Sequence, residues 1–565
     1  MLICGVKVSH DGGIALIDNG QLVASIEVEK VDNGLRYSPL GRLAMVGELL
    51  AQWGVTVADV DQFVVDGWWA STTDATEPSV KVVNVAGRSV HLPVAPYVDG
   101  ADTQGPLHRY EFAPVSFATG TDPVGYSSYH HATNHIMGAY CTSPFAARSE
   151  DALVVVWDGG IVPRAYKVSA RDRSVSLLAP LIPVVGNIFP DFCAHFEPFR
   201  RNTDGMSTVD YMRHHLEIAG KAMAYAALGT TAEHAFDVFD RLFDGLPGIS
   251  LDNAFLLGEK VTANRDELLP DLSNADIIAT FQAYLGQRLV KALTRLVQTR
   301  YQGHPPNLVL GGGCALNIKW NSALRATGAF REVWVPPFPN DSGAAIGTAC
   351  AEMFRTGRAV LDWDVYCGPA VAPSTPPPGW TVRPCDERQL AELLHAEDEP
   401  VVVITGRAEL GPRALGNRSI IAPATSVRMK EVLNNVKGRA HYRPVAPLCL
   451  ESRAPEVFDP GVPDPYMLFE HTMRPGWAAR VPAVVHLDGT ARLQTVDDHS
   501  HSPIAAILAE YERLSGIPVL CNTSANLNGH GFFPDVRTAA EWGRCRYIWS
   551  DGVLYTHPDS SFRAA

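Results

Sequence analysis

The stretch MLICGVKVSHDGGIALIDNGQLVASIEVEK, residues 1–30, decides the fold class of this chain. Its three apolar runs, Leu2–Val8, Gly13–Ile17 and Leu22–Val28, are separated by turns that contain Gly, Asn and Asp. Short apolar runs bounded by such turn residues predict three antiparallel strands joined by tight turns. The first of these turns has room for a phosphate close to its backbone.

The pattern of a buried strand followed by an acidic, glycine-bearing turn returns later in the chain. The apolar run Leu153–Trp157 ends in the turn Asp158–Gly160, which indicates an internally duplicated fold. Between Ala275 and Tyr301 apolar residues recur with helical periodicity. The strand Leu308–Leu310 and the turn Gly311–Gly313 follow, so this region predicts an α/β unit in which a nucleotide can approach the backbone.

A proline-rich stretch separates this first part from a second α/β part. Pro369–Pro384 holds six prolines in sixteen residues, which disfavours a helix or a central strand. We take this stretch as the main domain linker. Downstream, the apolar pattern predicts strands and helices in the ranges 401–405, 484–486 and 519–521 (strands) and 426–436 and 503–515 (helices).

Composition limits the classes of protein to which the chain can belong. Its 565 residues are 46% hydrophobic and 19% charged, enough to bury a large core divided into several domains. The net charge of -14 disfavours nucleic acid as the main partner. The first residues do not resemble a signal peptide, and no apolar run reaches the roughly 18 residues of a membrane span. Ten scattered cysteines without a CxxC pair favour reduced thiols, and we expect a cytoplasmic protein.

Two histidines, His131 and His135, are four residues apart and would share one face of a helix. Asp158 and Asp341 follow apolar strands, where a carboxylate often holds a metal or faces a phosphate. Each feature alone also fits a surface pair, a turn residue or a helix cap. Together, two histidines and an aspartate would form an open metal site suited to Lewis-acid chemistry.

The anion-binding signals lie in both parts. The turn Gly311–Gly313 opens a helix, so its N–H groups could meet an anion, although a tight packing turn remains an alternative. The densest polar motif is residues 406–443, in which Glu409 and Glu431 are the only acids between Arg407 and Arg443. Concentrated arginine in an acidic protein favours phosphate capture. Arg492 and the turn 522–526 add donors, with turn or cap roles as the alternative.

The motifs in this order resemble the carbamoyltransferases of natural-product biosynthesis, the type that acts on tobramycin, nodulation factors and hydroxymethylcephems. The resemblance covers nearly the whole chain. Its matching pieces are SHDGGIALIDNGQLVASIEVEK (9–30), HATNH (131–135), SPF (143–145), WDGG (157–160), GKAMAYAALG (220–229), GGGCALN (311–317), NDSGAAIGTA (340–349), GPRALGNRSI (411–420), YRPVAP (442–447), DGTARLQTV (488–496) and VLCNTSANLNGHGF (519–532).

The resemblance implies an α/β (α+β) protein with an actin-like ATPase (ASKHA, TsaD-like) domain over residues 1–366, a Pro-rich linker over 367–384 and a YrdC-like domain over 385–565. It implies that the YrdC-like domain makes carbamoyl-adenylate from carbamoyl phosphate and Mg-ATP. The first domain would then transfer the carbamoyl group to a hydroxyl of a small molecule beside Fe(II) or another divalent metal. A homodimer is a further expectation of the resemblance, and no membrane or nucleic-acid partner is expected.

The resemblance also implies roles for single residues. Catalytic roles fall to His10, Asp11 and Asp158, and the metal ligands would be His131, His135, Asp158 and Asp341. In the transfer domain the nucleotide would lie against Lys221, Gly312, Gly313, Asn317 and Asp341. ATP and carbamoyl phosphate would bind in the YrdC-like domain to Arg413, Arg418, Ser419, Lys437, Arg443, Arg492, Asn522, Ser524 and Asn526.

The chain departs from the family pattern at three places. The usual HHxxH has Ala132 at its second position, the basic stretch after the third strand becomes 29–36 (EKVDNGLR), and the acidic turn after the NTS motif becomes 529–532 (GHGF). Residues 60–125 and 185–260 resemble insertions that would shape an acceptor pocket.

Three alternatives remain open at the level of sequence. They are a nucleotide-binding regulator without catalysis, a threonylcarbamoyl transferase acting on tRNA, and a hydrogenase maturation factor. The charge disfavours the second, and the lack of CxxC pairs disfavours the third.

Overall fold

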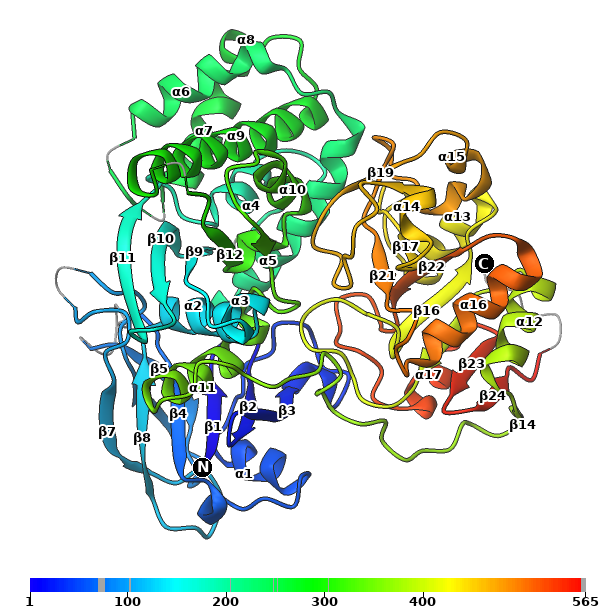
Figure 1. Cartoon of the computed structure of the whole chain (residues 1–565), viewed down its shortest axis with the longest axis horizontal. Coiled ribbons are helices and arrows are strands. Elements are labelled where there is room, and N and C mark those ends of the chain that lie inside the picture. Colours follow the sequence, from blue (N-terminus) through cyan, green and yellow to red (C-terminus); the bar gives the residue numbers. More distant parts are fainter. Residues whose placement is uncertain are drawn as a thin grey trace.

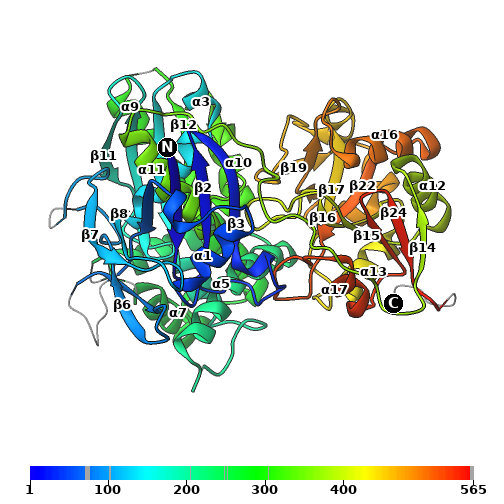
Figure 2. The same cartoon turned by 90° about the horizontal axis from the view of Figure 1, so that it is seen from below.

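A computed structural model describes residues 1–69, 77–100, 103–203, 205–246, 248–250, 252–302 and 304–559. The N-terminal part, blue to green in Figure 1, lies beside a C-terminal part coloured yellow to red. Strand β3 (Gln21–Glu27) is the strand of the first sheet nearest the C-terminal part in both views (Figure 1 and Figure 2). The contact between the parts therefore begins at the edge of that sheet.

The first sheet has the strand order β3-β2-β1-β4-β8-β7. Strand β1 pairs antiparallel with β2 and parallel with β4, and β2 pairs antiparallel with β3. The three antiparallel strands predicted from residues 1–30 are thus confirmed. The bounds are β1 Leu2–Lys7, β2 Gly13–Asp18, β4 Gln62–Asp66, β7 Tyr110–Val115 and β8 Val124–Tyr129, and a separate hairpin comprises β5 Ser79–Val83 and β6 Ser89–Pro93.

The second sheet repeats this arrangement with the order β11-β10-β9-β12-β13. Strand β9 pairs antiparallel with β10 and parallel with β12, as β1 does with β2 and β4. This correspondence confirms the predicted internal duplication. The bounds are β9 Ala152–Asp158, β10 Ile161–Ser169, β11 Ser174–Pro180, β12 Asn307–Gly311 and β13 Val333–Trp334.

Helices α2 (His131–Cys141) and α11 (Ala344–Arg355) lie between the two sheets in Figure 1. Helix α11 packs on β1 and β2, and α2 packs on β9 and β12 and against α11. The two helices approach closely because Gly347 faces Asn134, where a Cβ would lie 2.0 Å from the Asn134 carbonyl oxygen. This close packing fixes the two histidines at the start of α2 relative to the segment that enters α11.

The remaining helices of the N-terminal part surround the sheets. The predicted helix 275–301 is confirmed as α9, which begins with a capping box between Ser273 and Asp276. The bounds are α1 Ala44–Ala51, α3 Pro144–Ala147, α4 Ile188–Cys193, α5 Thr208–Tyr225, α6 Phe236–Asp244, α7 Asn253–Ala263, α8 Arg265–Leu268, α9 Asn274–Arg300 and α10 Ile318–Ala326.

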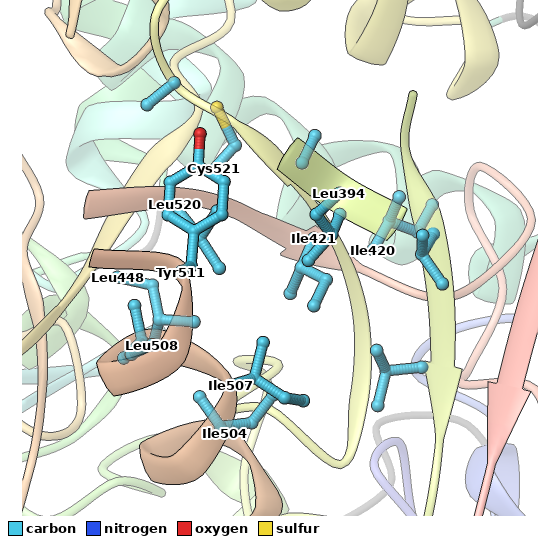
Figure 3. Packing of buried hydrophobic residues seen from close by; sticks show 14 of the residues in the cluster. Leu394, Ile420, Ile421, Leu448, Ile504, Ile507, Leu508, Tyr511, Leu520 and Cys521 are labelled. Carbon is cyan, nitrogen blue, oxygen red and sulfur yellow. The ribbon is translucent and has the colours of Figure 1, made fainter. Parts of the chain in front are cut away.

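The C-terminal part is built on a sheet with the order β14-β24-β23-β15-β16-β22-β17-β21. Helix α16 (Pro503–Ser515) turns Ile504, Ile507, Leu508 and Tyr511 toward this sheet, as Figure 3 shows. The strands are β14 Thr381–Pro384, β15 Val401–Ile404, β16 Arg418–Pro423, β17 Ala446–Leu450, β21 Gln494–Val496, β22 Val519–Ser524, β23 Tyr547–Ser550 and β24 Val553–Thr556. A small sheet and further helices complete it: β18 Phe458–Asp459, β19 His471–Met473, β20 Thr490–Ala491, α12 Glu387–Glu397, α13 Val427–Val436, α14 Ala454–Val457, α15 Trp477–Arg480 and α17 Val536–Trp542.

Two sequence predictions in this part need correction. The last four residues of the predicted linker, Thr381–Pro384, form edge strand β14, which pairs with β24. The predicted strand 484–486 is not a strand, because Pro482 starts a 3-10 turn, Pro482–Val484, in its place. The predicted helices 426–436 and 503–515 and the strands near 401 and 519 are confirmed. Among the described residues, no helix is long and apolar enough to cross a membrane.

Candidate active site

A cluster of charged side chains lies where the central strands of both sheets end. Lys7 ends β1, Asp66 ends β4 and Asp158 ends β9. Helix α2 begins at His131 beside them, and Asp341 starts the 3-10 turn Asp341–Gly343 that leads into α11. The duplicated topology therefore brings polar residues from distant parts of the chain to one place.

Four of these residues form a compact group of ligand-type atoms. The nearest ligand atoms of His131, His135, Asp158 and Asp341 all lie within 4.8 Å of one another, and all four residues are buried. The two Nε2 atoms are 3.2 Å apart, and Oδ1 of Asp341 lies 3.3 and 3.5 Å from them. Two imidazoles with two carboxylates are a donor set that suits a divalent transition-metal ion.

The histidines of this group are oriented by partners behind them. Nδ1 of His131 lies 2.8 Å from Oδ2 of Asp66, and Nδ1 of His135 lies 3.1 Å from the carbonyl oxygen of Pro339. A proton on each Nδ1 satisfies these acceptors and leaves each Nε2 directed at the group. Lys7 completes the arrangement with Nζ 2.7 Å from both Asp66 and Asp341.

The ionisation of the group follows from these neighbours. Although burial disfavours a charged carboxylate, Lys7, His131 and His10 hold the pKa of Asp341 well below its usual value. Burial likewise opposes protonation of His131, but Asp66 and Asp341 raise its pKa well above the usual value. Burial and Asp341 act to raise the pKa of Asp158, yet His135 and His131 lower it to about 2. Both carboxylates are therefore charged.

His10 lies at the edge of this group, in the turn after β1. Its Nδ1 is 2.8 Å from Oδ2 of Asp11, and its Nε2 is 3.4 Å from Oδ2 of Asp341. Asp11 can thus accept the Nδ1 proton and leave Nε2 of His10 as a proton acceptor. The three predicted catalytic residues, His10, Asp11 and Asp158, line one cavity of about 670 Å³.

The predicted nucleotide residues of the N-terminal part lie around the same cavity. Gly312 has φ +85, and a Cβ there would lie 2.3 Å from the Trp157 carbonyl oxygen, so a larger residue cannot be placed. The N–H of Gly313 donates to Oδ1 of Asp158 at 2.7 Å. Asn317 caps α10, and Lys221 pairs with Glu217 at 2.6 Å. All of these except Gly312 line the cavity, with Asp341.

The segments predicted to shape an acceptor pocket supply other walls of this cavity. Trp68, Trp69 and Tyr97 come from the range 60–125, and the ring of Tyr97 stacks on Trp69 with centroids 4.1 Å apart. Asp191 on α4 and His215 on α5 come from the range 185–260. Residues 70–76, 101–102, 204, 247 and 251 of these ranges lie outside the described residues.

A group of arginines lies where this cavity adjoins a second one of about 140 Å³. Arg36, Arg413, Arg443 and Arg492 line both cavities, and Arg439 lines the smaller one. In the described part of the chain, no carboxylate forms an ion pair with Arg413, Arg443 or Arg492. Their Nε atoms are buried without a hydrogen-bond partner in the same part of the structure.

Burial and the neighbouring positive charges lower the pKa values of Arg413 and Arg492. Burial and then Arg492, Arg36 and Arg443 lower the pKa of Arg413 well below its usual value. Burial and then Arg443 and Arg439 lower the pKa of Arg492 to about 10. Since buried cations without a counter-charge are costly, the site favours an anionic ligand with several oxygens.

Comparison with known proteins identifies the family. Two family models match the chain: Carbamoyltransferase N-terminus over residues 2–350 and Carbamoyltransferase C-terminus over residues 391–546. The chain belongs to the carbamoyltransferase family. It is 44% identical to Nodulation protein U of Rhizobium tropici, over 98% of this chain and 96% of that protein. It is 32% identical to the 3'-hydroxymethylcephem-O-carbamoyltransferase of Streptomyces clavuligerus, over 96% of each chain.

This carbamoyltransferase is an enzyme with a mixed α/β fold. Among solved structures it is similar to the activator of the 2-hydroxyisocaproyl-CoA dehydratase from Clostridium difficile with bound ADPNP. That likeness has 15% identity and a TM-score of 0.33, and it covers 63% of this chain and 96% of the other. A likeness at this level does not establish the fold.

Four residues assigned to the ATP and carbamoyl phosphate site are not among the residues that line the two cavities of this carbamoyltransferase. The Arg418 guanidinium is buried and donates to backbone carbonyl oxygens, including those of Thr405 at 2.6 Å and Asn417 at 3.0 Å. Ser419 accepts from the N–H of Gly416 at 3.0 Å. Lys437 donates to the Ser524 carbonyl oxygen and to Asn526. The polar atoms of Arg418, Ser419, Lys437 and Asn526 thus contact other groups of the protein in this structure, and their assignment to the ATP and carbamoyl phosphate site stays a prediction.

The other predicted residues of this site do face the cavities. Arg413, Arg443, Arg492, Asn522 and Ser524 line the smaller one. Sequence reasoning missed Lys7, Asp66, Arg36 and Tyr97. Asp66 had a usable signal, because it ends an apolar strand as Asp158 does. Lys7 also stood out as a charged residue within an apolar run.

Proposed function

We propose that this carbamoyltransferase is an ATP-dependent O-carbamoyltransferase. In the proposal, the C-terminal part forms carbamoyl-adenylate from carbamoyl phosphate and ATP. The N-terminal part then transfers the carbamoyl group to a hydroxyl of a small-molecule natural product in the cytoplasm. We also propose an actin-like ATPase fold for the N-terminal part, which its duplicated sheets support, and a YrdC-like fold for the C-terminal part.

The observation that carries this proposal is the set of uncompensated arginines between the two cavities. Arg413, Arg443 and Arg492 face the cavities with no carboxylate partner among the described residues. A polyphosphate or carbamoyl phosphate would supply the missing negative charge through charge-assisted hydrogen bonds. Because the same arginines line both cavities, an adenylate formed beside them has a short path to His10 and Asp158.

The group of His131, His135, Asp158 and Asp341 would hold Fe(II) or another divalent ion. Bound there, such an ion would act as a Lewis acid on the carbamoyl oxygen. The protein's own contribution is to fix the ligands. Asp66 and the Pro339 carbonyl oxygen orient the two imidazoles, and Lys7 lies between Asp66 and Asp341.

His10 is the proposed general base for the transfer step. Its Nε2 would take the proton of the acceptor hydroxyl while the oxygen attacks the carbamoyl carbon. The bond between that carbon and the adenylate oxygen breaks, and AMP leaves with the electron pair. Asp11 stabilises the imidazolium that results, because its Oδ2 lies 2.8 Å from Nδ1 of His10.

The acceptor would enter through the wall formed by Trp69, Tyr97, Asp191 and His215. Nδ1 of His215 lies 2.9 Å from the carbonyl oxygen of Tyr211, so its Nε2 is an acceptor, 3.6 Å from Asp191. Burial raises the pKa of Asp191 to about 7, which makes a protonated carboxyl available as a donor. A donor beside an acceptor matches the two hydrogen-bonding roles of a hydroxyl group.

The test is conversion of ATP to AMP by purified protein with Fe(II), with and without carbamoyl phosphate. Mass spectrometry against a panel of hydroxylated natural products follows. We expect AMP only with carbamoyl phosphate, and an acceptor heavier by the mass of HNCO. AMP formation independent of carbamoyl phosphate, or no AMP at all, would contradict the proposal and favour a regulator without catalysis.

Two variants separate the steps. Arg439→Ala changes a residue that lines only the smaller cavity and should remove AMP formation. It should keep transfer from supplied carbamoyl-adenylate. His10→Ala should form the adenylate but not transfer it. Loss of both activities in both variants would rule out two separate sites.

A further inference from the structure

Lys30 is a buried cation of the N-terminal part that contacts the backbone of the C-terminal part. It ends the 3-10 turn Val28–Lys30 directly after β3, and its side chain is 2% exposed. Nζ donates to Oε1 of Glu27 at 2.6 Å and to the carbonyl oxygens of Glu409 and Gly411, each at 2.7 Å. All three ammonium donors are therefore used, two of them across the contact between the two parts.

Gly411 is held from a second side as well. Its N–H donates to Oε1 of Glu27 at 3.2 Å. Its φ is +81, and a Cβ there would lie 2.2 Å from the carbonyl oxygen of Pro337. Pro337 belongs to the segment that leads to the metal-site residue Asp341. The Gly411 backbone is thus fixed between Lys30 and the loop segment that leads to Asp341.

The Glu409 side chain holds the second half of the same loop through hydrogen bonds to backbone N–H groups. Its Oε1 accepts from the backbone N–H groups of Leu415 at 2.7 Å, Asn417 at 2.8 Å and Arg418 at 3.0 Å. Arg413 lies between the residues held by Lys30 and those held by the Glu409 carboxylate. Its own guanidinium has no ion pair among the described residues, so backbone contacts determine where it points.

We propose that Lys30 is a positioning residue that, through the Glu409 and Gly411 carbonyl groups, holds Arg413 at the junction of the two cavities. The loop held by Lys30 is the means by which the N-terminal part sets the geometry of the arginine site. That the arginine site binds carbamoyl phosphate rests on the proposed function, whereas the contact of Lys30 with the Glu409 and Gly411 carbonyl groups does not. The competing explanation is that Lys30 only neutralises the buried Glu27.

The test compares Lys30→Met, the double variant Lys30→Met/Glu27→Gln and the exposed-lysine control Lys81→Met. The double variant removes the buried carboxylate that Lys30→Met leaves unpaired, so it serves even where the single variant does not fold. Hydrogen exchange of peptides covering residues 406–419 reports the loop without any assay of activity. Carbamoyl phosphate-dependent AMP formation reports the arginine site.

We expect faster exchange in 406–419 and a fall in kcat/KM for carbamoyl phosphate of roughly 10- to 100-fold in both Lys30 variants. The control should match the wild type in both measurements. Unchanged exchange, or exchange that rises without any fall in kcat/KM, would overturn the inference. So would recovery of both properties in the double variant, because charge neutralisation alone would then explain Lys30. If the Lys30 variants show faster exchange but the wild type forms no AMP, the proposed function is contradicted. Lys30 then still positions the loop.

Discussion

At the scale of single residues, the site depends on a few side chains that touch no reacting group. Asp66 is one of them, because it accepts from His131 and from Nδ2 of Asn134 at 2.6 Å while pairing with Lys7. It sets the orientation of His131 and balances the charge of Lys7. Residues of this kind control a metal site as strongly as some ligands do.

Asp66→Asn should weaken binding of Fe(II) or Co(II) by about 10- to 100-fold, because the imidazole of His131 loses its charged acceptor. Titration calorimetry with each metal measures the change. The exposed carboxylate variant Asp122→Asn is the matched control and should bind as the wild type does. Metal affinity equal in both variants would remove Asp66 from the site.

Removal of one of the buried arginines should raise the stability of the free protein but weaken its binding of carbamoyl phosphate. Arg492→Met removes a buried cation that lies against Arg443 and Arg439. We expect the free energy of unfolding without ligand to rise by on the order of 1 kcal/mol, because an unfavourable charge is lost. Thermal unfolding should also show less stabilisation by carbamoyl phosphate than in the wild type, where ligand at 100 times its Kd adds about 2.7 kcal/mol.

The control for that experiment is Arg171→Met, which changes an exposed arginine of the N-terminal part. It should alter neither the free energy of unfolding nor the stabilisation by carbamoyl phosphate. A destabilised Arg492→Met protein that still gains full stability from carbamoyl phosphate would show that Arg492 has a structural role only.

At the scale of elements, the pair α2 and α11 connects the two sheets to the site. Gly347 on α11 meets the Asn134 carbonyl oxygen, and a Cβ on Gly138 of α2 would lie 3.1 Å from the Cα atom of Gly347. Both helices carry site residues at or just before their first turns, so their separation determines the distance between the histidines and Asp341.

Gly347→Ala should lower the free energy of unfolding by about 1–3 kcal/mol, because the new methyl group overlaps backbone that cannot move far. It should also weaken metal binding, since α2 must shift away from Asp341. Thermal unfolding and metal titration test the two effects. Gly125→Ala, where a Cβ meets nothing within 4 Å, is the control. Reduced stability with unchanged metal affinity would separate helix packing from the site.

Sequence patterns predicted most elements because each had a local signal. The strands after Leu2, the helix after Ser273 and the histidine pair on α2 all follow from periodicity and caps. Arg418 could not be assigned in this way, because only the fold reveals that backbone carbonyl groups surround it. Arg36 was missed because only the fold places it beside Arg413, Arg443 and Arg492 at the two cavities.

Two of the three departures from the family pattern, residues 29–36 and 529–532, contact each other in the structure. The N–H of Arg36 donates to the Gly529 carbonyl oxygen at 2.9 Å, and the N–H of Gly531 donates to that of Gly34 at 2.9 Å. Lys30 also lies over the ring of Phe532, 5.1 Å from its centroid. No single segment of sequence reveals this contact between the two stretches.

At the scale of the whole molecule, the two cavities adjoin each other, because Arg36, Arg413, Arg443 and Arg492 line both. On the proposed function, an adenylate formed in the smaller cavity moves to His10 without entering bulk water. Such a route would protect it, because mixed anhydrides of carbamate hydrolyse readily.

Product made from labelled carbamoyl phosphate should therefore keep more label than complete mixing would leave when about a tenfold excess of unlabelled carbamoyl-adenylate is added, although part of the added adenylate is also transferred. Mass spectrometry of the carbamoylated acceptor measures the label. An isotope ratio equal to that of the mixed pool would mean that the intermediate leaves the protein between the two steps.

The repeated turns of the two sheets lead to a last consequence. His10-Asp11-Gly12-Gly13-Ile14 and Trp157-Asp158-Gly159-Gly160-Ile161 share a sequence pattern and both supply residues to one cavity, but Asp11 lies in the loop between β1 and β2, whereas Asp158 is the last residue of β9. In two identical chains related by symmetry, both aspartates would have to behave alike. Within one chain their surroundings differ: Oδ2 of Asp11 lies 2.8 Å from Nδ1 of His10, whereas Asp158 lies in the group with His131, His135 and Asp341. Asymmetry of this kind gives one cavity two carboxylates with different surroundings.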